Sequence, residues 1–399
     1  MLDLIGFLNL LMINKKLKSI NPKNNLIINS WDIFSQSKID LIIENASNAQ
    51  LEWESENINL RIELIKEFYY ILKNKNKELS ILMADEMGKP VSQGKLEIDK
   101  CLWACDYYIK NAKIFFINKN IETEYFKSYV TYRPIGLVLG IMPWNFPFWQ
   151  VIRFSLPALI VGNGVLLKHS SNVQGCANAI KECFIEAGFP SYIFNNLQIP
   201  RDMVAGVIEN NNVCGVAITG STLAGRAVAK KAGECLKKTV LELGGSDPYL
   251  ILDDADINLA VESCVQGRLL NTGQSCISAK RLIVTKKNIN VFTKRLIDLL
   301  ETKIVGDPYD DVDLGPLVSL SARDEVHGKV IESIKCGAKL KLGGNLLEGE
   351  GSYYPITVLS DVKPGMPAFE DEIFGPIFSI IMAKNDNEAI RLANESKFG

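Results

Sequence analysis

The feature that most constrains the fold is a regular alternation between short apolar runs and longer amphipathic segments, which begins at residue 135. The apolar runs are IGLVLGIMP at 135–143, VLLKH at 165–169 and VCGVAITG at 213–220. Helical periodicity covers the segments 174–187 and 222–232. Parallel strands that are buried on both faces have continuous apolar sequences and are joined by helical crossovers. The alternation therefore predicts a doubly wound parallel sheet.

A second alternating series follows the glycine pair at 244–245 and predicts a second lobe. It contains apolar runs at 249–254 and 279–284 and helical patterns at 257–270, 291–300 and 322–336. Upstream, residues 37–110 have helical periodicity, whereas YFKSYVTYRP at 125–134 alternates as a strand of a hairpin arm would. The predicted fold class is α/β, with two doubly wound, Rossmann-like lobes and a β-hairpin arm.

Charge and residue usage exclude several classes of function. The net charge is −2, without a basic stripe, which argues against nucleic-acid binding. The nine cysteines are dispersed, as in a protein of a reducing cytoplasm. Cys101 and Cys105 lie one helical turn apart, but no second pair of cysteines or histidines has the spacing of a metal site. Only two histidines exist, His169 and His327, so a catalytic triad or a histidine-rich metal centre would have to use one of them. We expect no metal.

The first twelve residues, MLDLIGFLNLLM, form an apolar run that is too short to span a bilayer. The run contains Asp3 and lacks the positive start and the cleavage site of a secretory signal. It is read either as an over-extended start, with Met12 as the alternative first residue, or as a disordered cap. We expect no membrane segment and a cytoplasmic location.

Cys276 is the candidate nucleophile, in the stretch NTGQSC between a helical pattern and an apolar run. A turn there can expose a thiol and aim backbone N–H groups at it, and a free thiol with a pKa of about 8.5 needs such activation. The alternative is a buried structural cysteine, which is what we expect for most of the other eight.

Two further side chains complement a thiol. Glu242 lies near the end of the apolar stretch TVLEL, where partial desolvation would suit a general base, and a strand-end ion pair is the alternative. Asn145 lies between Trp144 and Phe146 in PWNFP, and a rigid amide of this kind could stabilise an oxyanion. The alternative is a turn asparagine that bonds its own backbone.

A weaker pattern indicates phosphate binding. The sequence has no GxGxxG fingerprint, but GSTLAG at 220–225 lies between a strand and a helix, whose N–H groups could hold a pyrophosphate. Lys168 ends a predicted strand and could reach a ribose or a phosphate. Ser171 lies where nucleotide-binding folds often place an acid, and a serine there does not disfavour a 2′-phosphate.

These motifs together carry a family resemblance. PWNFP, GSTLAG, LELGGSDP, NTGQSC and EDEIFGP occur in the order and approximate spacing of the aldehyde dehydrogenase superfamily, from about Asn21 to the last residue. The sequence is most similar to the bacterial succinate-semialdehyde dehydrogenases of the shorter type, on the segments EMGKP, IMPWNFPFWQVIR and GNGVLLKHSSNV.

The resemblance implies an NAD- or NADP-dependent oxidation of a small aldehyde to a carboxylate through a cysteine thiohemiacetal and thioester. Cys276 would be the nucleophile, Glu242 the base and Asn145 the oxyanion donor. Cofactor contacts would come from both lobes, through Trp144, Lys168, Ser171, Gly220, Ser221, Gly225, Glu372 and Phe374. Arg153 resembles a residue that binds the carboxylate of succinate semialdehyde, with Arg268 assisting, and a surface ion pair of Arg153 is the alternative.

The resemblance also implies a domain organisation and an oligomer. Residues 1–115 and 134–243 would form the NAD(P)-binding domain, 116–133 an oligomerisation arm and 244–399 the catalytic domain. A homodimer or homotetramer is expected of the full-length protein. Members of the family continue for several tens of residues beyond ANESKFG, so the C-terminal part is expected to be missing here, with final strands and a pocket loop.

Three other functions stay open. The first is the oxidation of another small aldehyde. The second is a CoA-acylating reaction, for which Glu242 would be superfluous. The third is a non-catalytic role for a truncated family member.

Overall fold

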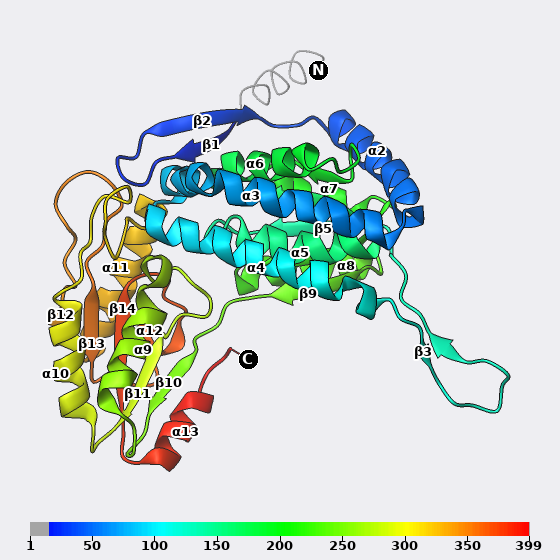
Figure 1. The fold of residues 1–399 in the computed structure, drawn as a ribbon. Coiled ribbons are helices and arrows are strands. Elements are labelled where there is room, and N and C mark those ends of the chain that lie inside the picture. The colour runs from blue at the N-terminus through cyan, green and yellow to red at the C-terminus, as the bar shows by residue number, and fades with distance from the viewer. Residues whose placement is uncertain (1–15, 399) are drawn as a thin grey trace, which may run out of the picture. The chain divides into compact units, whose positions relative to one another are not determined.

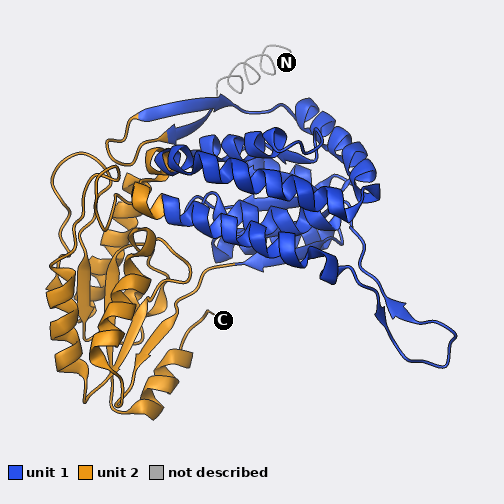
Figure 2. Ribbon diagram, in the orientation of Figure 1, with its two compact units in different colours: residues 1–19, 27–82, 95–242 blue, residues 20–26, 83–94, 243–399 orange. Residues whose placement is uncertain are grey.

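The computed structural model describes residues 16–398, and the predicted apolar start at 1–12 lies outside the described residues. The chain divides into two compact units (Figure 2). Unit 1 consists of Met1–Ser19, Ile27–Leu82 and Lys95–Glu242. Unit 2 consists of Ile20–Leu26, Met83–Gly94 and Leu243–Gly399. Which unit binds a cofactor and which is catalytic stays a prediction.

Unit 1 is built on a five-stranded sheet in which all neighbouring strands are parallel (Figure 1). The strand order is β7-β6-β5-β8-β9. The strands are β5 (Leu137–Met142), β6 (Gly164–His169), β7 (Phe194–Asn196), β8 (Val213–Thr219) and β9 (Lys238–Glu242). Since the chain moves outward from β5 in both directions, the predicted doubly wound topology is confirmed.

Unit 1 also contains helices, some of which cover the almost completely buried strands β5 and β6. They are α2 (Gln36–Ser55), α3 (Ile58–Met87), α4 (Val91–Phe115), α5 (Trp149–Val161), α6 (Gln174–Glu186), α7 (Val204–Glu209) and α8 (Thr222–Glu234). Short 3-10 turns are η1 (Ser171–Val173) and η2 (Arg201–Met203), and a two-stranded sheet contains β1 (Lys16–Ile20) and β2 (Ile27–Asp32). On one face, Ile39 and Ile43 of α2 pack in a cluster with Leu139 and Leu166 of the sheet.

The predicted hairpin arm is present in unit 1 but has very short strands. β3 (Lys119–Asn120) pairs antiparallel with β4 (Tyr129–Val130), and Figure 1 shows the loop between them extending away from the helices of unit 1. Tyr125 and Phe126 near its tip are exposed. Its role in oligomerisation stays a prediction.

Unit 2 contains a second five-stranded sheet with the order β10-β11-β14-β13-β12. The strands are β10 (Pro248–Ile251), β11 (Arg281–Thr285), β12 (Lys339–Leu342), β13 (Thr357–Ser360) and β14 (Ile377–Ala383). The helical elements are α9 (Ile257–Leu269), η3 (Leu270–Gly273), α10 (Ile289–Leu300), α11 (Leu320–Lys335), α12 (Pro367–Glu370) and α13 (Asp386–Asn394). All pairings are parallel except that of the edge strand β12 with β13.

The central strand β14 explains why this sheet has a core on each face. Ile377 and Ile381 pack into one hydrophobic cluster, whereas Phe378 and Ile380 pack into the other. This division follows from the alternation of side chains along a strand. The apolar run IFSIIMA is therefore a strand that is buried at every position except Met382.

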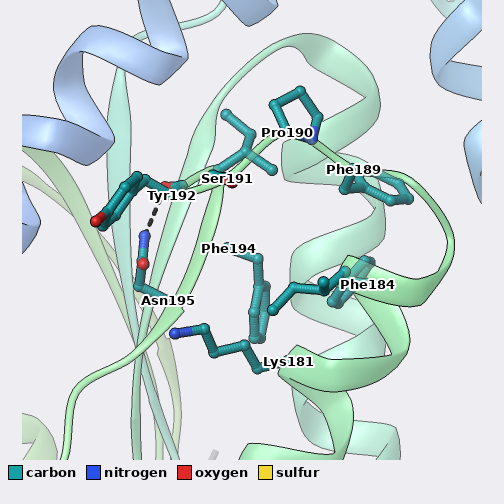
Figure 3. Close-up of a pocket in the computed structure, with 10 residues that line it drawn as sticks. Lys181, Phe184, Phe189, Pro190, Ser191, Tyr192, Phe194 and Asn195 are labelled. Carbon is teal, nitrogen blue, oxygen red and sulfur yellow. Dashed lines mark hydrogen bonds between the residues drawn. The ribbon is translucent and has the colours of Figure 1, made fainter.

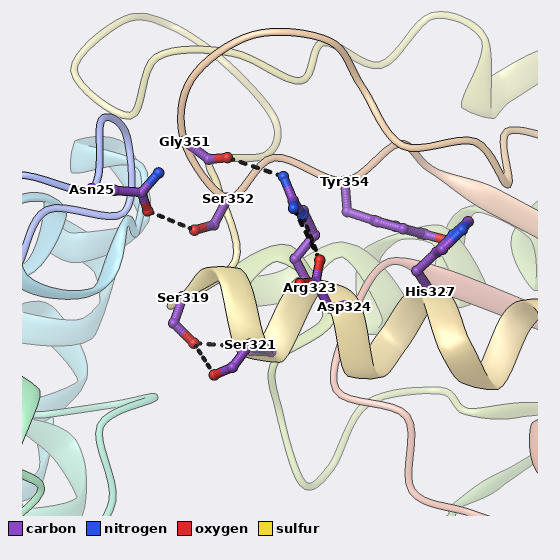
Figure 4. Close-up of polar contacts among 10 residues, drawn as sticks. Asn25, Ser319, Ser321, Arg323, Asp324, His327, Gly351, Ser352 and Tyr354 are labelled. Atoms are coloured by element: carbon purple, nitrogen blue, oxygen red, sulfur yellow. Dashed lines mark hydrogen bonds and ion pairs between the residues drawn. The ribbon is translucent and has the colours of Figure 1, made fainter.

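Two short segments from early in the chain belong to unit 2 through hydrogen bonds. In the segment 20–26, Asn25 accepts a hydrogen bond from Ser352 Oγ at 3.3 Å (Figure 4), and Pro22 O accepts one from the Ser352 N–H at 2.8 Å. In the segment 83–94, the N–H of Val91 donates to Pro308 O at 2.8 Å. Local sequence carries no sign of these long-range contacts.

Candidate active site

In unit 1 the predicted residues gather at the carboxyl edge of the parallel sheet. Asn145 follows β5, Lys168 lies at the end of β6, Gly220 follows β8 and Glu242 ends β9. The carboxyl ends of parallel strands meet at one edge, and a doubly wound sheet binds its ligands there, beside the strand at which the order reverses. That strand is β5, so the turn that carries Asn145 is central to this edge.

The turn 143–147 is held rigidly. Asn145 is 3 % exposed, and Trp144 before it is half-buried. Directly after the turn, the N–H groups of Phe148 and Trp149 both donate to Glu97 Oε1 at 2.9 Å. These groups lie at the start of α5, where helical N–H donors have no partner within the helix. Glu97 thus caps α5 from the neighbouring helix α4.

Glu242 and Arg153 lie together at the same edge. Arg153 Nη2 is 3.8 Å from Glu242 Oε2 and donates to Thr219 Oγ1 at 3.3 Å, while Nε donates to Gln150 Oε1 at 2.8 Å. The Glu242 side chain is 56 % exposed because β9 is an edge strand. The desolvation that its apolar sequence neighbours predicted is therefore not seen.

The remaining residues of unit 1 that are candidates for cofactor binding provide positive electrostatic potential and backbone N–H donors. Ser221 caps α8 by accepting the N–H of Ala224 at 3.3 Å, and Gly225 is buried in the first turn of this helix. Burial lowers the pKa of Lys168, which is 8 % exposed, and the charge of Arg201 lowers it further. Ser171 begins η1. A helix N-terminus and a buried cation suit a dinucleotide, so these residues fit the cofactor that the resemblance implies.

In unit 2 the stretch NTGQSC forms a tight, anchored turn. Asn271 and Thr272 have φ values of 55° and 57°, a region that few side chains adopt. At Gly273, a Cβ atom would lie 2.2 Å from Gly375 O, so only glycine fits. The N–H of Asn271 donates to Gln93 Oε1 at 2.7 Å. Cys276 follows this turn and is half-buried, which leaves its thiol partly accessible.

Lys280 is a neighbour of Cys276 that the sequence did not single out. Its side chain is 3 % exposed, donates to Cys276 O, and lies 3.3 Å from Glu372 Oε1 and 5.9 Å from the Phe374 ring centroid. Burial lowers the pKa of Lys280, while the charge of Glu372 opposes that shift. A Cβ atom at Gly244 would lie 2.4 Å from Glu372 Oε2, so the carboxylate packs against bare backbone. The sequence signal that could have identified Lys280 is a charged residue at the start of an apolar strand.

Arg268 was expected to assist in binding the substrate carboxylate, but its surroundings in the structure are those of a core residue. It is 1 % exposed, and it donates to Ile377 O at 2.6 Å, Ser278 Oγ at 2.7 Å and Ile373 O at 2.9 Å. Burial lowers its pKa to about 9. The guanidinium ties the segment that follows Cys276 to the start of β14, and this burial does not support the predicted contact with a substrate.

A cavity lies elsewhere in unit 1. It has a volume of about 250 Å³ and lies between the end of α6 and the start of β7, at the amino edge of the sheet (Figure 3). Phe184, Phe194 and Lys181 are among its lining residues. None of the predicted site residues lines it. Among residues 16–398, no group of three His, Cys, Asp or Glu side chains could hold a metal ion.

Comparisons with known proteins agree with the pattern of residues. A family model described as the aldehyde dehydrogenase family matches residues 12–399. The Escherichia coli protein named succinate semialdehyde dehydrogenase (NAD(P)+) Sad is 40 % identical over 382 residues, which cover 96 % of this chain and 83 % of that protein. A Mycobacterium avium protein named succinate-semialdehyde dehydrogenase (NADP(+)) is 36 % identical and covers 96 % and 82 %.

Solved structures give the same result. The crystal structure of succinic semialdehyde dehydrogenase from Streptococcus pyogenes, in complex with NADP+, has a TM-score of 0.94 and 33 % identity, covering 96 % of this chain and 85 % of that one. Lactaldehyde dehydrogenase from Escherichia coli has a TM-score of 0.92 and 31 % identity, covering 96 % and 81 %.

Proposed function

This chain belongs to the aldehyde dehydrogenase family, and on that premise we propose that it oxidises succinate semialdehyde to succinate with NAD or NADP. The observation that carries the proposal is the anchored turn at Cys276. There a half-buried thiol follows a rigid loop, and Lys280 links its backbone to the Glu372 carboxylate. A nucleophile held in this way is already oriented for attack.

The residues of the chain account for the acyl chemistry. The Cys276 thiolate attacks the aldehyde carbon and forms a thiohemiacetal. The Asn145 amide and the N–H of Cys276 donate hydrogen bonds to its oxyanion. After the loss of a hydride the intermediate is a thioester, and Glu242 takes a proton from the water that hydrolyses it. The products are a carboxylate and the free thiol.

A bound nicotinamide dinucleotide supplies the hydride acceptor. In unit 1, Lys168 and Ser171 would contact the adenosine ribose, Trp144 would line the cofactor site, and the pyrophosphate would lie along Gly220, Ser221 and Gly225. In unit 2, Glu372 would bind the nicotinamide ribose and Phe374 would pack beside the ring. Ser171 carries no charge that would repel a 2′-phosphate, so we propose that NADP is accepted as well as NAD.

Arg153 is the proposed determinant of substrate choice. Its side chain is 33 % exposed and its guanidinium is only loosely paired with Glu242, so it can also bind a carboxylate. We propose a cytoplasmic homodimer or homotetramer in which the arm at 116–133 contacts another copy. Among residues 16–398, no helix has the length and apolar character needed to cross a membrane.

The test is a panel of aldehydes measured with both cofactors on the purified protein and its Arg153→Ala variant. Succinate semialdehyde should have the highest kcat/KM, and the variant should lose about 10–100-fold on it, as for the loss of one charge-assisted hydrogen bond. Lactaldehyde and other neutral aldehydes should change little. A panel without turnover on any aldehyde would refute the proposed activity, whereas an unchanged preference in the variant would refute the role of Arg153.

A further inference from the structure

We propose that His169 is a positioning residue for catalysis, because its ring holds the turn that presents the Asn145 amide to the oxyanion. The inference rests on the proposed function of Asn145. His169 ends β6, is completely buried, and takes no part in the acyl chemistry described above. It belongs to the strand next to β5, from which the Asn145 turn leaves the sheet.

The imidazole contacts both ends of the turn 143–147. Its Nε2 atom is 3.0 Å from Pro147 O, and its Nδ1 atom is 3.2 Å from Met142 O. The N–H of Ser170 points at Nδ1 from 2.9 Å and at Met142 O from 3.0 Å. Met142 is the residue before the turn and Pro147 is its last, so Nε2 faces the end of the turn, while the Ser170 N–H lies between Nδ1 and the carbonyl that precedes the turn.

These contacts fix the tautomer of His169. A backbone N–H can only donate, so the Nδ1 atom that faces the Ser170 N–H must carry the lone pair. The ring proton then resides on Nε2 and is donated to Pro147 O. Burial, with a smaller contribution from the charge of Lys168, lowers the pKa of His169 to about 4, so the neutral ring persists at physiological pH.

The turn is thereby fixed from two sides. His169 holds the carbonyl of Pro147, and Glu97 holds the N–H groups of Phe148 and Trp149 that follow it. Asn145 lies two residues before Pro147, and its backbone cannot shift without breaking one of these contacts. Oxyanion donors act only when they are held in place before the reaction, and a displacement of about 1 Å can cost about 100-fold in rate.

Two isosteric substitutions test the donor role of Nε2 and the acceptor role of Nδ1 in His169 separately. His169→Gln keeps a donor near the Nε2 position, whereas His169→Asn keeps an acceptor near Nδ1 and loses the contact with Pro147 O. We expect His169→Asn to lower kcat by about 10- to 100-fold, with the KM for aldehyde and the Kd for NADP within about twofold. His169→Gln should retain kcat within about threefold. His327→Asn, which removes a ring that contacts Tyr354 Oη at 3.1 Å in unit 2 (Figure 4), is the control and should change neither quantity.

A double-mutant cycle decides whether His169 acts through Asn145. Once Asn145→Ala has removed the amide, adding His169→Asn should cost no further activity. Losses in kcat that add in full would overturn the inference, as would a His169→Gln variant that is as slow as His169→Asn. If His169→Asn does not fold, His169→Phe takes its place in the cycle with Asn145→Ala. His169→Gln remains the variant with which it is compared. If the wild type is active, Asn145→Ala has a low kcat and His169→Asn has a normal kcat, this inference alone is refuted. If the wild type itself has no turnover, the proposed function is refuted.

Discussion

Two loops carry the candidate chemistry, and they are anchored by groups of different charge. The Asn145 turn in unit 1 is held by a neutral imidazole and a carboxylate, His169 and Glu97. The Cys276 loop in unit 2 is bordered by the buried cations Arg268 and Lys280, both of which donate to backbone carbonyls.

The difference follows from which backbone groups each loop leaves without partners. The Asn145 turn runs into the start of α5, which exposes N–H donors and therefore needs an acceptor such as Glu97. The strained Cys276 loop and the segment before β14 expose carbonyls, and each guanidinium supplies several donors in a fixed geometry. A buried backbone group without a hydrogen-bond partner costs free energy. Exposed N–H groups are therefore bound by an acceptor, and exposed carbonyls by a cationic donor.

The largest effect should come from the thiol of unit 2. Cys276→Ser should lower kcat by about 10⁴-fold or more, because a hydroxyl is a far weaker nucleophile at neutral pH. Steady-state turnover with NADP measures it. Cys336→Ser, an exposed cysteine on the same unit, is the matched control and should keep full activity. A serine variant within tenfold of wild type would remove Cys276 from the mechanism.

The cationic anchor should dominate the stability of its loop. Arg268→Leu leaves Ile377 O, Ile373 O and Ser278 Oγ without their buried donor and should lower the free energy of unfolding by about 3–5 kcal/mol. Urea unfolding measures the change. Arg153→Leu, which removes a partly exposed arginine from unit 1, should cost no more than about 1 kcal/mol. Equal costs would show that burial does not distinguish the two arginines.

The neutral anchor should make stability depend on pH. The pKa of His169 is about 4 in the folded chain against an ordinary value of 6.5, so the unfolded state takes up its proton first as the pH falls. The corresponding stability, about 3 kcal/mol, is present above pH 6.5 and is lost as the pH falls towards 4. Urea unfolding at pH 7.5 and pH 4.5 should show this loss in wild type, and His169→Gln should lack that part of it. Identical pH profiles would contradict a buried neutral ring.

The smallest effect should come from the carboxyl edge of unit 1, which is rich in N–H donors. Ser171→Glu adds a negative charge beside Lys168 and should shift the ratio of kcat/KM from NADP towards NAD by about tenfold. Ser171→Ala is the control and should move the ratio by no more than about twofold. If the glutamate left the ratio unchanged, the 2′-phosphate would not lie at Ser171.

Sequence reasoning succeeded where a pattern was local. The runs that became β5 and β8 are apolar at nearly every position, which is the signature of a strand covered on both faces. The edge strand β12 was missed because KLKL is short and largely exposed. Arg268 was placed with the substrate because it precedes the cysteine in sequence, but its position on α9 turns it into the core.

The sequence by itself determined the family, the doubly wound class and the order of the motifs, because these depend on local periodicity and on residue types at fixed spacing. Only the tertiary structure decided which partners those motifs meet. The contact of Lys280 with Glu372 joins residues far apart in the chain, and His169 reaches the Asn145 turn only because β6 lies beside β5. Side chains of these types occur in many settings, and folding selects the one backbone group or charge that satisfies each of them.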